Sequence, residues 1–451
     1  MRDYTKDAKL VQKEAESSKA PTSAGRSRII SGATHFDDLV FMTAQAAKRP
    51  IDYFRQNIQP VKAKTVLGKR SKHPIEIDGA AIVAAMSFGA LSATAKIAIA
   101  KGATLAGTID NTGEGGMLPE ERAAARFIIA QYSTARFGVD VDEYLRKADI
   151  IEIKFGQGAK PGQGGLLPGD KVTERVAKTR STKEKPVNAG DTLHSPPYHL
   201  DIFTVEDLKE RIKWLREVTD GKPIIVKIGA CNLFADLPLI VQADPDIIAI
   251  DGGQGGTGAS PKVMLEHTGI PTLGALIEAR FILDHLKAPQ ELWMAGGIQT
   301  GHDMAVCLAL GADAVFVGVA LMQAMGCVGC GQCYKGKCPL GIATQDPELE
   351  AKLVLDEAAE KVANFFKHCT EEIKMLAAAC GYDDIHKLSV EDLRALTFEA
   401  QMITGIPMSG GPAIMAWMQQ QQQRKQQGCD GHCRGECHCR EHGNPEDSLD
   451  F

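Results

Sequence analysis

Short apolar segments alternate with longer amphipathic segments from residue 77 onward, and this alternation restricts the fold more than any other feature of the chain. Such alternation is typical of parallel βαβ units. Amphipathic segments at 205–218, which Thr204 and Asp207 would cap, and at 273–286 are predicted helices. Eight βα units in about 250 residues predict a (β/α)8 (TIM) barrel. The predicted strands are residues 82–86, 107–110, 136–139, 150–154, 223–228, 246–250, 292–295 and 314–319.

An open doubly wound sheet is the competing fold. It is disfavoured because no early Gly-x-Gly-x-x-Gly turn is followed, about twenty residues later, by an acidic residue. We expect an N-terminal arm and cap over residues 1–75, polar and without a role of its own up to residue 25 and helical around 36–47. The remaining predicted divisions are the barrel at 76–350, a helical extension at 351–417, and a Gln-rich spacer with a Cys/His-rich tail at 418–451.

Composition narrows the class of protein. Hydrophobic residues make up 44% of the chain and charged residues 24%, as in a soluble globular protein. The formal charge of −6 offers no basic surface for nucleic acid, and no apolar run is long enough to predict a membrane span. The charged N-terminus lacks a secretory signal, and the cysteines gather in two clusters. These features predict metal chemistry in the reducing cytoplasm.

The first cysteine cluster follows the last predicted strand and holds Cys327, Cys330, Cys333 and Cys338, with Pro339 directly after it. Four thiolates separated by glycines in one loop suit an iron–sulfur cluster. A structural zinc site more usually divides its cysteines into two separated pairs. Idle thiols and a disulfide are weaker alternatives.

The second cluster lies in the C-terminal tail and combines four cysteines with three histidines. These ligand types predict zinc or another thiophilic metal. Their spacing matches no standard zinc finger, and a low-complexity end with incidental thiols is the alternative. The residues are Cys429, His432, Cys433, Cys437, His438, Cys439 and His442.

The active site of such a barrel forms at the carboxyl ends of its strands. Several glycines and one lysine of this chain lie at those positions. Gly296, Gly297 and Gly318 follow the last two strands, where backbone N–H groups bind phosphate in such barrels, although tight turns are the alternative. Lys227 ends the fifth strand and needs a partner if it is buried. That partner would be either the electron-rich edge of a flavin ring or the carboxylate of Asp251. A phosphate site beside an iron–sulfur loop predicts a flavin, which joins one-electron clusters to hydride chemistry.

Longer motifs resemble the FMN-binding synthase domain of glutamate synthase, in that family's order, from residue 84 to residue 350. In that family the fold is a (β/α)8 barrel that binds FMN, with a [3Fe–4S] cluster on the loop after strand eight. The motifs are MSFGALS at 86–92, NTGEGG at 111–116, IEIKFGQGAKPGQGGLLPG at 151–169, HSPPYHLDIFTVEDL at 194–208, GGTGASP at 255–261, and C-x5-C-x4-CPLGIATQDPELE from Cys327.

The resemblance implies roles for individual residues. The cluster ligands would be Cys327, Cys333 and Cys338, and Cys330 is extra; as a fourth ligand it would give a [4Fe–4S] cluster. The catalytic contacts to 2-oxoglutarate would be Glu114, Lys154 and Gln157. A dicarboxylate favours a cation and an imine needs a proton carrier, although Lys154 and Glu114 would also pair with each other. The FMN contacts would be Met86, Ser87, Lys227, Gly256, Thr257, Gly296, Gly297 and Gly318.

The implied activity is that of an oxidoreductase acting on CH–NH2 donors. Electrons would pass from the cluster to FMN, which reduces 2-iminoglutarate, made from 2-oxoglutarate and ammonia, to L-glutamate. The chain is also similar to the FMN subunit of N-methylglutamate synthase, which leaves methylamine open as the amine. A non-catalytic electron-transfer subunit of a larger complex is the alternative from another class.

Two departures from the family, and the lack of an evident pyridine-nucleotide site, bear on partners and contacts. The family's amidotransferase domain uses an N-terminal cysteine as its nucleophile, but no cysteine precedes Cys231 here, so we expect ammonia from a separate amidotransferase or another ammonia-supplying subunit. No pyridine-nucleotide site is evident, so we expect electrons from ferredoxin or a reductase partner in a hetero-oligomer. The family's Gly-His-Asp is replaced by Gly252-Gly253-Gln254, which puts side-chain contacts at the last two positions in doubt.

Overall fold

Eight parallel strands form one sheet in the order β5-β15-β14-β12-β11-β8-β7-β6, in a computed structural model that describes residues 22–27, 30–55, 59–410, 418–419 and 423. A hydrogen bond of 3.2 Å from Val83 N to Ile109 O joins the two edges. The predicted (β/α)8 barrel is confirmed. Its strands are β5 (Ala81–Val83), β6 (Asp110–Asn111), β7 (Ile128–Tyr132), β8 (Ile150–Lys154), β11 (Ile224–Gly229), β12 (Ile247–Asp251), β14 (Glu291–Ala295) and β15 (Ala314–Val317).

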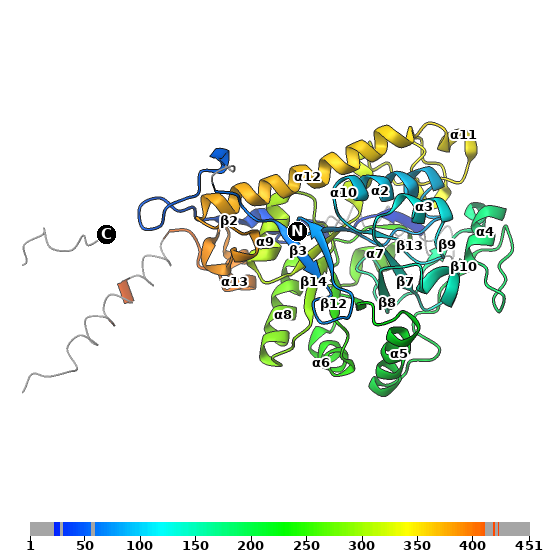
Figure 1. Ribbon diagram of the computed structural model, residues 1–451, viewed down its shortest axis with the longest axis horizontal. Coiled ribbons are helices and arrows are strands. Elements are labelled where there is room, and N and C mark those ends of the chain that lie inside the picture. The colour runs from blue at the N-terminus through cyan, green and yellow to red at the C-terminus, as the bar shows by residue number, and fades with distance from the viewer. Residues whose placement is uncertain (1–21, 28–29, 56–58, 411–417, 420–422, 424–451) are drawn as a thin grey trace, which may run out of the picture. The chain divides into compact units, whose positions relative to one another are not determined.

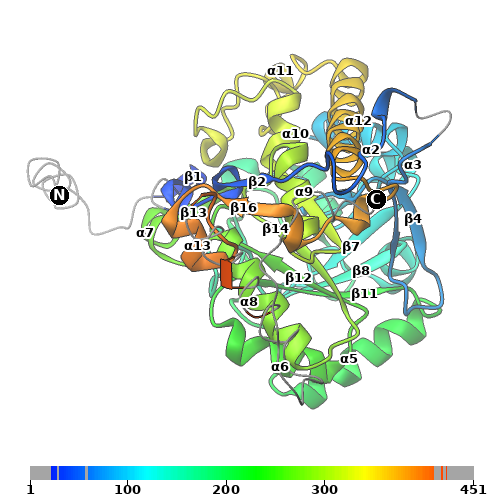
Figure 2. The same ribbon diagram turned by 90° about the vertical axis from the view of Figure 1, so that its left-hand side faces the viewer.

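Helices surround this sheet. Figure 2 shows α5, α6 and α8 along one side of the strands and α2, α10 and α12 along the opposite side. The predicted cap of α5 is present, since Thr204 Oγ1 accepts from Asp207 N at 3.1 Å and Asp207 Oδ2 accepts from Thr204 N at 2.9 Å. The helices after the strands are α2 (Ala93–Leu105), α3 (Pro119–Ala124), α4 (Glu174–Arg180), α5 (Val205–Val218), α6 (Leu233–Ala243), α7 (Lys262–His267), α8 (Thr272–His285), α9 (Gly301–Ala309) and α10 (Val319–Ala324).

The barrel interior is filled with apolar side chains toward the amino ends of the strands. Ile82, Ile225, Trp293 and Phe316 belong to this core, and the rings of Trp293 and Phe316 lie 5.5 Å apart between centroids. The hairpin of β3 (Lys64–Leu67) and β4 (Ile75–Asp78) adds Leu67, Ile75 and Ile77 to the same core. Open space for a ligand is therefore confined to the carboxyl ends of the strands.

Two predicted elements were wrong. The third strand is not 136–139 but Ile128–Tyr132, whose five residues are all buried. Arg136 instead has a positive φ of 57° and places its guanidinium 3.7 Å from the Tyr132 ring centroid, so this segment turns back over the strand. The predicted helix at 36–47 is a 3-10 turn (Phe36–Asp38) followed by β2 (Leu39–Phe41), which pairs antiparallel with β16 (Leu393–Ala395). That long-range pairing overrides the local helical pattern.

Segments outside the barrel pack on it. The strand β1 (Thr22–Gly25) pairs antiparallel with β13 (Thr257–Pro261), at the carboxyl ends of the barrel strands. The helix α12 (Leu355–Ala379) runs along α2 in both views, and a Cβ at Gly102 of α2 would lie 2.7 Å from the Val362 side chain, so the two helices touch (Figure 1). The extension continues to α13 (Phe398–Thr404).

The remaining predictions on the chain's organisation are not decided by these contacts. The division at residues 75, 350 and 417 stays a prediction. The predicted arm up to residue 21 and the tail cluster from Cys429 to His442 lie outside the described residues. No helix in the described part of the chain is long and apolar enough to cross a membrane.

Candidate active site at the mouth of the barrel

A cavity of about 500 Å³ opens at the carboxyl ends of the strands, within the range of roughly 300–1,000 Å³ that small-molecule sites occupy. Every predicted catalytic residue, FMN contact and cluster ligand of the barrel lines it, and so does Cys330. The roles assigned to these residues stay predictions, but their convergence is a finding. The lining includes Met86, Ser87, Glu114, Lys154, Gln157, Lys227, Gly256, Thr257, Gly296, Gly297, Gly318, Cys327, Cys333 and Cys338.

Strand alternation places two lysines side by side at the barrel mouth. Lys154 of β8 is in register with Lys227 of β11, and both are buried. Each lysine has a carboxylate of its own: Glu114 Oε2 lies 3.1 Å from Lys154 Nζ, and Asp251 Oδ2 lies 3.8 Å from Lys227 Nζ. Both ion pairs considered as alternatives from the sequence are therefore present, although two adjacent ammonium groups still favour a further anion.

The environment of Lys227 keeps it charged. Burial alone would lower the pKa of its ammonium group, but the carboxylates of Glu152 and Asp251 outweigh burial and raise the pKa above its ordinary value. Glu152 is inside the barrel and accepts hydrogen bonds from the side-chain amides of Asn111, at 3.2 Å, and Gln131. The cavity wall therefore includes a lysine that is charged at neutral pH.

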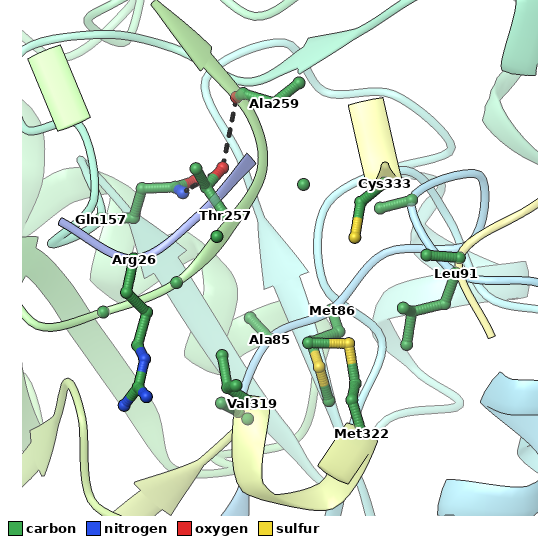
Figure 3. Close-up of a pocket in the computed structure, with 18 of the residues that line it drawn as sticks. Arg26, Ala85, Met86, Leu91, Gln157, Thr257, Ala259, Val319, Met322 and Cys333 are labelled. Atoms are coloured by element: carbon green, nitrogen blue, oxygen red, sulfur yellow. Dashed lines mark hydrogen bonds between the residues drawn. The ribbon is translucent and has the colours of Figure 1, made fainter. Parts of the chain in front are cut away.

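The three predicted catalytic residues form one hydrogen-bonded chain. Lys154 Nζ donates to Gln157 Oε1 at 3.2 Å, and Gln157 Nε2 donates to Thr257 Oγ1 at 3.4 Å. Figure 3 shows Gln157 beside Thr257, whose hydroxyl donates to Ala259 O at 3.2 Å. Ser195 Oγ donates to Glu114 Oε2 at 3.2 Å. Burial would raise the pKa of Glu114, but nearby cations, chiefly Lys154 and Arg180, lower it below its ordinary value, so Glu114 is ionised at neutral pH.

Two buried cations near Glu114 were missed from the sequence. Lys160 Nζ donates to Ala259 O at 2.8 Å, and burial together with the charge of Lys154 lowers its pKa to about 8. Arg180, at the end of α4, donates to Ser87 Oγ at 3.3 Å and to Phe88 O at 2.9 Å. Burial lowers its pKa to about 10. Together with Lys154 they surround the Glu114 carboxylate with three cations, of which Lys154 and Lys160 line the cavity.

Only one of these two cations left a signal in the sequence. Lys160 lies three residues after Gln157 within the motif IEIKFGQGAKPGQGGLLPG, so the motif pointed to it. Arg180 lies on the long segment between β8 and α5. In that segment no alternation along a strand predicts which way a side chain points. Its approach explains a motif glycine: Gly115 has a φ of +127°, and a Cβ there would lie 2.6 Å from the Arg180 guanidinium carbon.

The glycine-lined end of the cavity also contains an arginine from the N-terminal segment. Arg26, directly after β1, lines the cavity together with Gly296, Gly297 and Gly318. One guanidinium nitrogen lies 3.0 Å from the amide oxygen of Gln299, with that amide turned to face it. Arg26 reaches into the view of Figure 3 from β1, on the side of Val319. No role was predicted for Arg26 from the sequence.

Neither Gly253 nor Gln254, the two positions where the motif departs from the family, lines the cavity. Gln254 is buried, and its Oε1 accepts from Thr272 N at 2.6 Å and from Thr272 Oγ1 at 2.9 Å. A Cβ at Gly297 would meet Gln254 Cβ at 2.6 Å. Gln254 therefore supports the glycine turn from behind.

The four cysteines of the loop form the opposite wall of the cavity. Cys338 is buried, Cys327 and Cys333 are half-buried, and Cys330 is exposed. Burial raises the pKa of Cys333 above its ordinary value, and the nearby Lys171 acts against that shift. Figure 3 shows the Cys333 sulfur directed into the cavity, on the side of Met86 and Met322.

The loop cysteines share one wall of the cavity without forming a compact ligand group. In the described part of the chain, the one group of three potential ligand atoms that all lie within 4.8 Å of one another belongs to Asp37, His302 and Asp303. The predicted iron–sulfur cluster and the zinc alternative therefore both stay predictions for this loop.

Comparisons with known proteins agree with this geometry. Residues 12–383 match a family described as a conserved region in glutamate synthase. A "glutamate synthase large subunit-like protein" of Rhizobium meliloti (strain 1021) is 40% identical over 396 residues, covering 83% of this chain and 88% of that protein. An "archaeal glutamate synthase [NADPH]" of Methanocaldococcus jannaschii is 40% identical over 384 residues, covering 78% and 74%.

Solved structures support the fold alone. The flavin-binding domain of baker's yeast flavocytochrome b2 aligns with a TM-score of 0.51 at 15% identity, covering 92% of this chain and 88% of that domain. A mandelate oxidase variant aligns with a TM-score of 0.50 at 15% identity, covering 83% and 94%. At this level of identity the likeness extends to the barrel and not to its ligands.

Proposed function

Because the chain belongs to the glutamate synthase family, we propose that it is an oxidoreductase that makes L-glutamate by reducing 2-iminoglutarate, formed from 2-oxoglutarate and ammonia. Reduced FMN, supplied with electrons through an iron–sulfur cluster, is the reductant. The observation that carries the proposal is one cavity with a cation-rich side, a permanent lysine cation and a wall of cysteines. An electron-transfer subunit without catalysis has no use for the cation-rich side.

The residues present fit FMN. Lys227 is a buried cation that would face the electron-rich edge of the flavin ring, and Met86, Ser87, Gly256 and Thr257 line the same space. Gly296, Gly297 and Gly318 would bring backbone N–H groups to the phosphate, with Arg26 as its counter-charge. When bound, FMN supplies hydride chemistry.

The cation-rich side fits a dicarboxylate. Lys154 and Lys160, which line the cavity, offer charge-assisted hydrogen bonds to 2-oxoglutarate, and Arg180 adds positive charge near Glu114. Glu114, which is ionised and held by Ser195 and Lys154, would bind the ammonium ion or take the proton released as the imine forms. Methylamine in place of ammonia would give N-methylglutamate by the same steps.

The cluster would be held by Cys327, Cys333 and Cys338 and would accept electrons from a ferredoxin or reductase partner. Cys330 is exposed at the same wall and would complete a [4Fe–4S] cluster if it also bound iron. A separate ammonia-supplying subunit is part of this proposal.

The test starts from purified protein, with flavin absorbance and iron content measured first. Reduced, anaerobic enzyme is then mixed with 2-oxoglutarate and either ammonium or methylamine, while flavin reoxidation is followed and the product is identified by mass. We expect reoxidation only when substrate and amine are both present. Protein without flavin and iron, or reoxidation independent of any amine, would contradict the proposal.

Lys160 gives this reaction a pH dependence. Its pKa of about 8 means that the free enzyme loses this cation as the pH rises through 8, whereas the dianionic substrate binds the charged form. The KM for 2-oxoglutarate should therefore rise above pH 8, by up to about tenfold per pH unit. The Lys160→Met variant should have a higher KM at pH 7 and lack this rise. The exposed Lys178→Met variant is the control, and a flat wild-type KM between pH 7 and 9 would refute the assignment.

We predict that Arg26, in the N-terminal segment, contributes to FMN binding. Loss of a charge-assisted hydrogen bond costs about 1.5–3 kcal/mol, so Arg26→Met should weaken FMN binding roughly tenfold to a hundredfold. Titration of apoprotein with FMN, followed by flavin fluorescence, measures this. Arg55→Met, at an exposed arginine that pairs with Asp52 at 3.2 Å, should bind FMN as the wild type does. Equal affinities in all three proteins would remove Arg26 from the site.

A further inference from the structure

Lys171 is a buried lysine beside the cysteine loop that the proposed reaction does not use. It ends the 3-10 helix Gly169–Lys171 and is 3% exposed. Its Nζ donates to Ala90 O at 2.8 Å and to Cys333 O at 3.2 Å. Among the described residues, no carboxylate forms an ion pair with Lys171, and both oxygens that accept from its Nζ are backbone oxygens. A buried ammonium group favours a negative charge nearby, and iron-bound cysteine sulfurs at the same wall would supply one.

The cysteine loop is shaped around the Lys171 side chain. Gly336, two residues before Cys338, has a φ of +66°, and a Cβ there would lie 3.3 Å from Lys171 Cγ. The backbone of the loop thus packs against the lysine stem, while Cys333 O and Ala90 O hold the ammonium group in place. An ordinary surface lysine would extend its ammonium into water. Here the charge is fixed beside the wall that carries Cys333.

We propose that Lys171 is the counter-charge of the bound cluster and raises its affinity for an electron. The inference rests on the proposed function, because it requires a cluster on Cys327, Cys333 and Cys338. Reduction by one electron adds one negative charge to the cluster, and no bond needs to form or break in the protein. A fixed ammonium group nearby in a medium of low dielectric stabilises the reduced form more than the oxidised form. Lys171 is therefore a positioning residue that acts through the cluster.

The experiment is a redox titration of the holoenzyme with FMN and cluster bound. The electron paramagnetic resonance signal of the cluster is recorded at each potential. Lys171→Met removes the charge, Lys171→Gln removes it but keeps a hydrogen-bond donor, and Lys171→Arg keeps both. We expect the two neutral variants to lower the electron affinity of the cluster at least tenfold, about 59 mV for a one-electron couple. Lys171→Arg should stay near the wild type. Lys335→Met, at an exposed lysine two residues after Cys333, should shift less because solvent screens its charge.

Each outcome decides the proposal. An intact cluster with an unchanged potential in the neutral variants would overturn it, as would an equal shift in Lys335→Met. Neutral variants that keep FMN but lose the cluster would support it if Lys171→Arg keeps the cluster, because charge is then what the cluster requires. Loss of the cluster in all three variants would show that Lys171 only braces the loop, and would overturn it. Wild-type protein without iron or a cluster signal would overturn the proposed function itself.

Discussion

Cys333→Ala should abolish reduction of the flavin by a protein electron donor while FMN remains bound. Cys333 directs its sulfur into the cavity between Cys327 and Cys338 in the sequence, whereas the predicted flavin contacts come from other loops. Iron content should fall, and donor-driven flavin reduction should drop to background. Chemical reduction with dithionite bypasses the cluster, so dithionite-reduced variant should still convert 2-oxoglutarate and amine to product.

The matched control is Cys231→Ala, at an exposed cysteine that does not line the cavity. It should keep iron, flavin and donor-driven activity. If Cys333→Ala lost FMN together with the cluster, the loop would be a structural part of the flavin site first and an electron entry point second. Unchanged donor-driven reduction in Cys333→Ala would remove the cluster from the electron path.

The features predicted correctly from the sequence are those that depend on local patterns, namely the ends of most strands and the residues within the motifs. The strand at 150–154 appears with those bounds as β8, and its last residue, Lys154, lies in the cavity as expected. Lys227 and the glycines after β14 and β15 were found by the same reasoning, since parallel strands bring their carboxyl ends to one mouth. The third strand failed because two short apolar segments, 128–132 and 136–139, compete within a few residues. Only packing shows that Ile128–Tyr132 is the buried one.

The residues missed from the sequence reach the site through long-range contacts. Arg26 arrives because β1 pairs with β13, from the opposite half of the chain. Arg180 and Lys171 come from the segment between β8 and α5, whose path depends on how it packs over the mouth. Arg180 and Lys171 are cations that burial makes costly unless an anion binds nearby, and Arg26 is half-buried at the cavity. Such residues therefore mark ligand positions in the structure but have no periodic pattern by which a sequence reveals them.

The cavity separates two kinds of charge chemistry. On the β8 side, Lys154, Lys160 and Arg180 gather around Glu114, where a small dicarboxylate and an amine would meet. On the opposite wall, Lys171 donates to the backbone oxygen of Cys333, in the loop where a cluster would carry electrons. Lys227 lines the same cavity and is kept charged by Glu152 and Asp251. This order fits a path in which electrons enter at the cysteine wall and reach the substrate through the flavin.

Glu114→Gln should lower kcat by about 10²–10⁴-fold, the range that a positioned proton carrier contributes. The glutamine keeps the shape of the side chain and would still accept from Ser195, whose hydroxyl lies 3.2 Å from Glu114 Oε2. It cannot attract an ammonium ion or take up a proton, so both imine formation and amine binding should suffer. FMN content, cluster content and donor-driven flavin reduction should stay at wild-type values, because Glu114 belongs to the substrate side of the cavity.

The control for this variant is Glu120→Gln, six residues away, where an exposed carboxylate pairs with Arg175 at 2.8 Å. A surface pair of this kind is worth about 0–1 kcal/mol, so activity should not change. Steady-state rates with saturating 2-oxoglutarate and increasing amine separate the two effects: a rise in the KM for the amine reports lost ammonium binding, and a fall in kcat reports lost proton transfer. If Glu114→Gln kept the wild-type kcat and KM, Glu114 would have no part in the mechanism. Its ion pair with Lys154 would then have only a structural role.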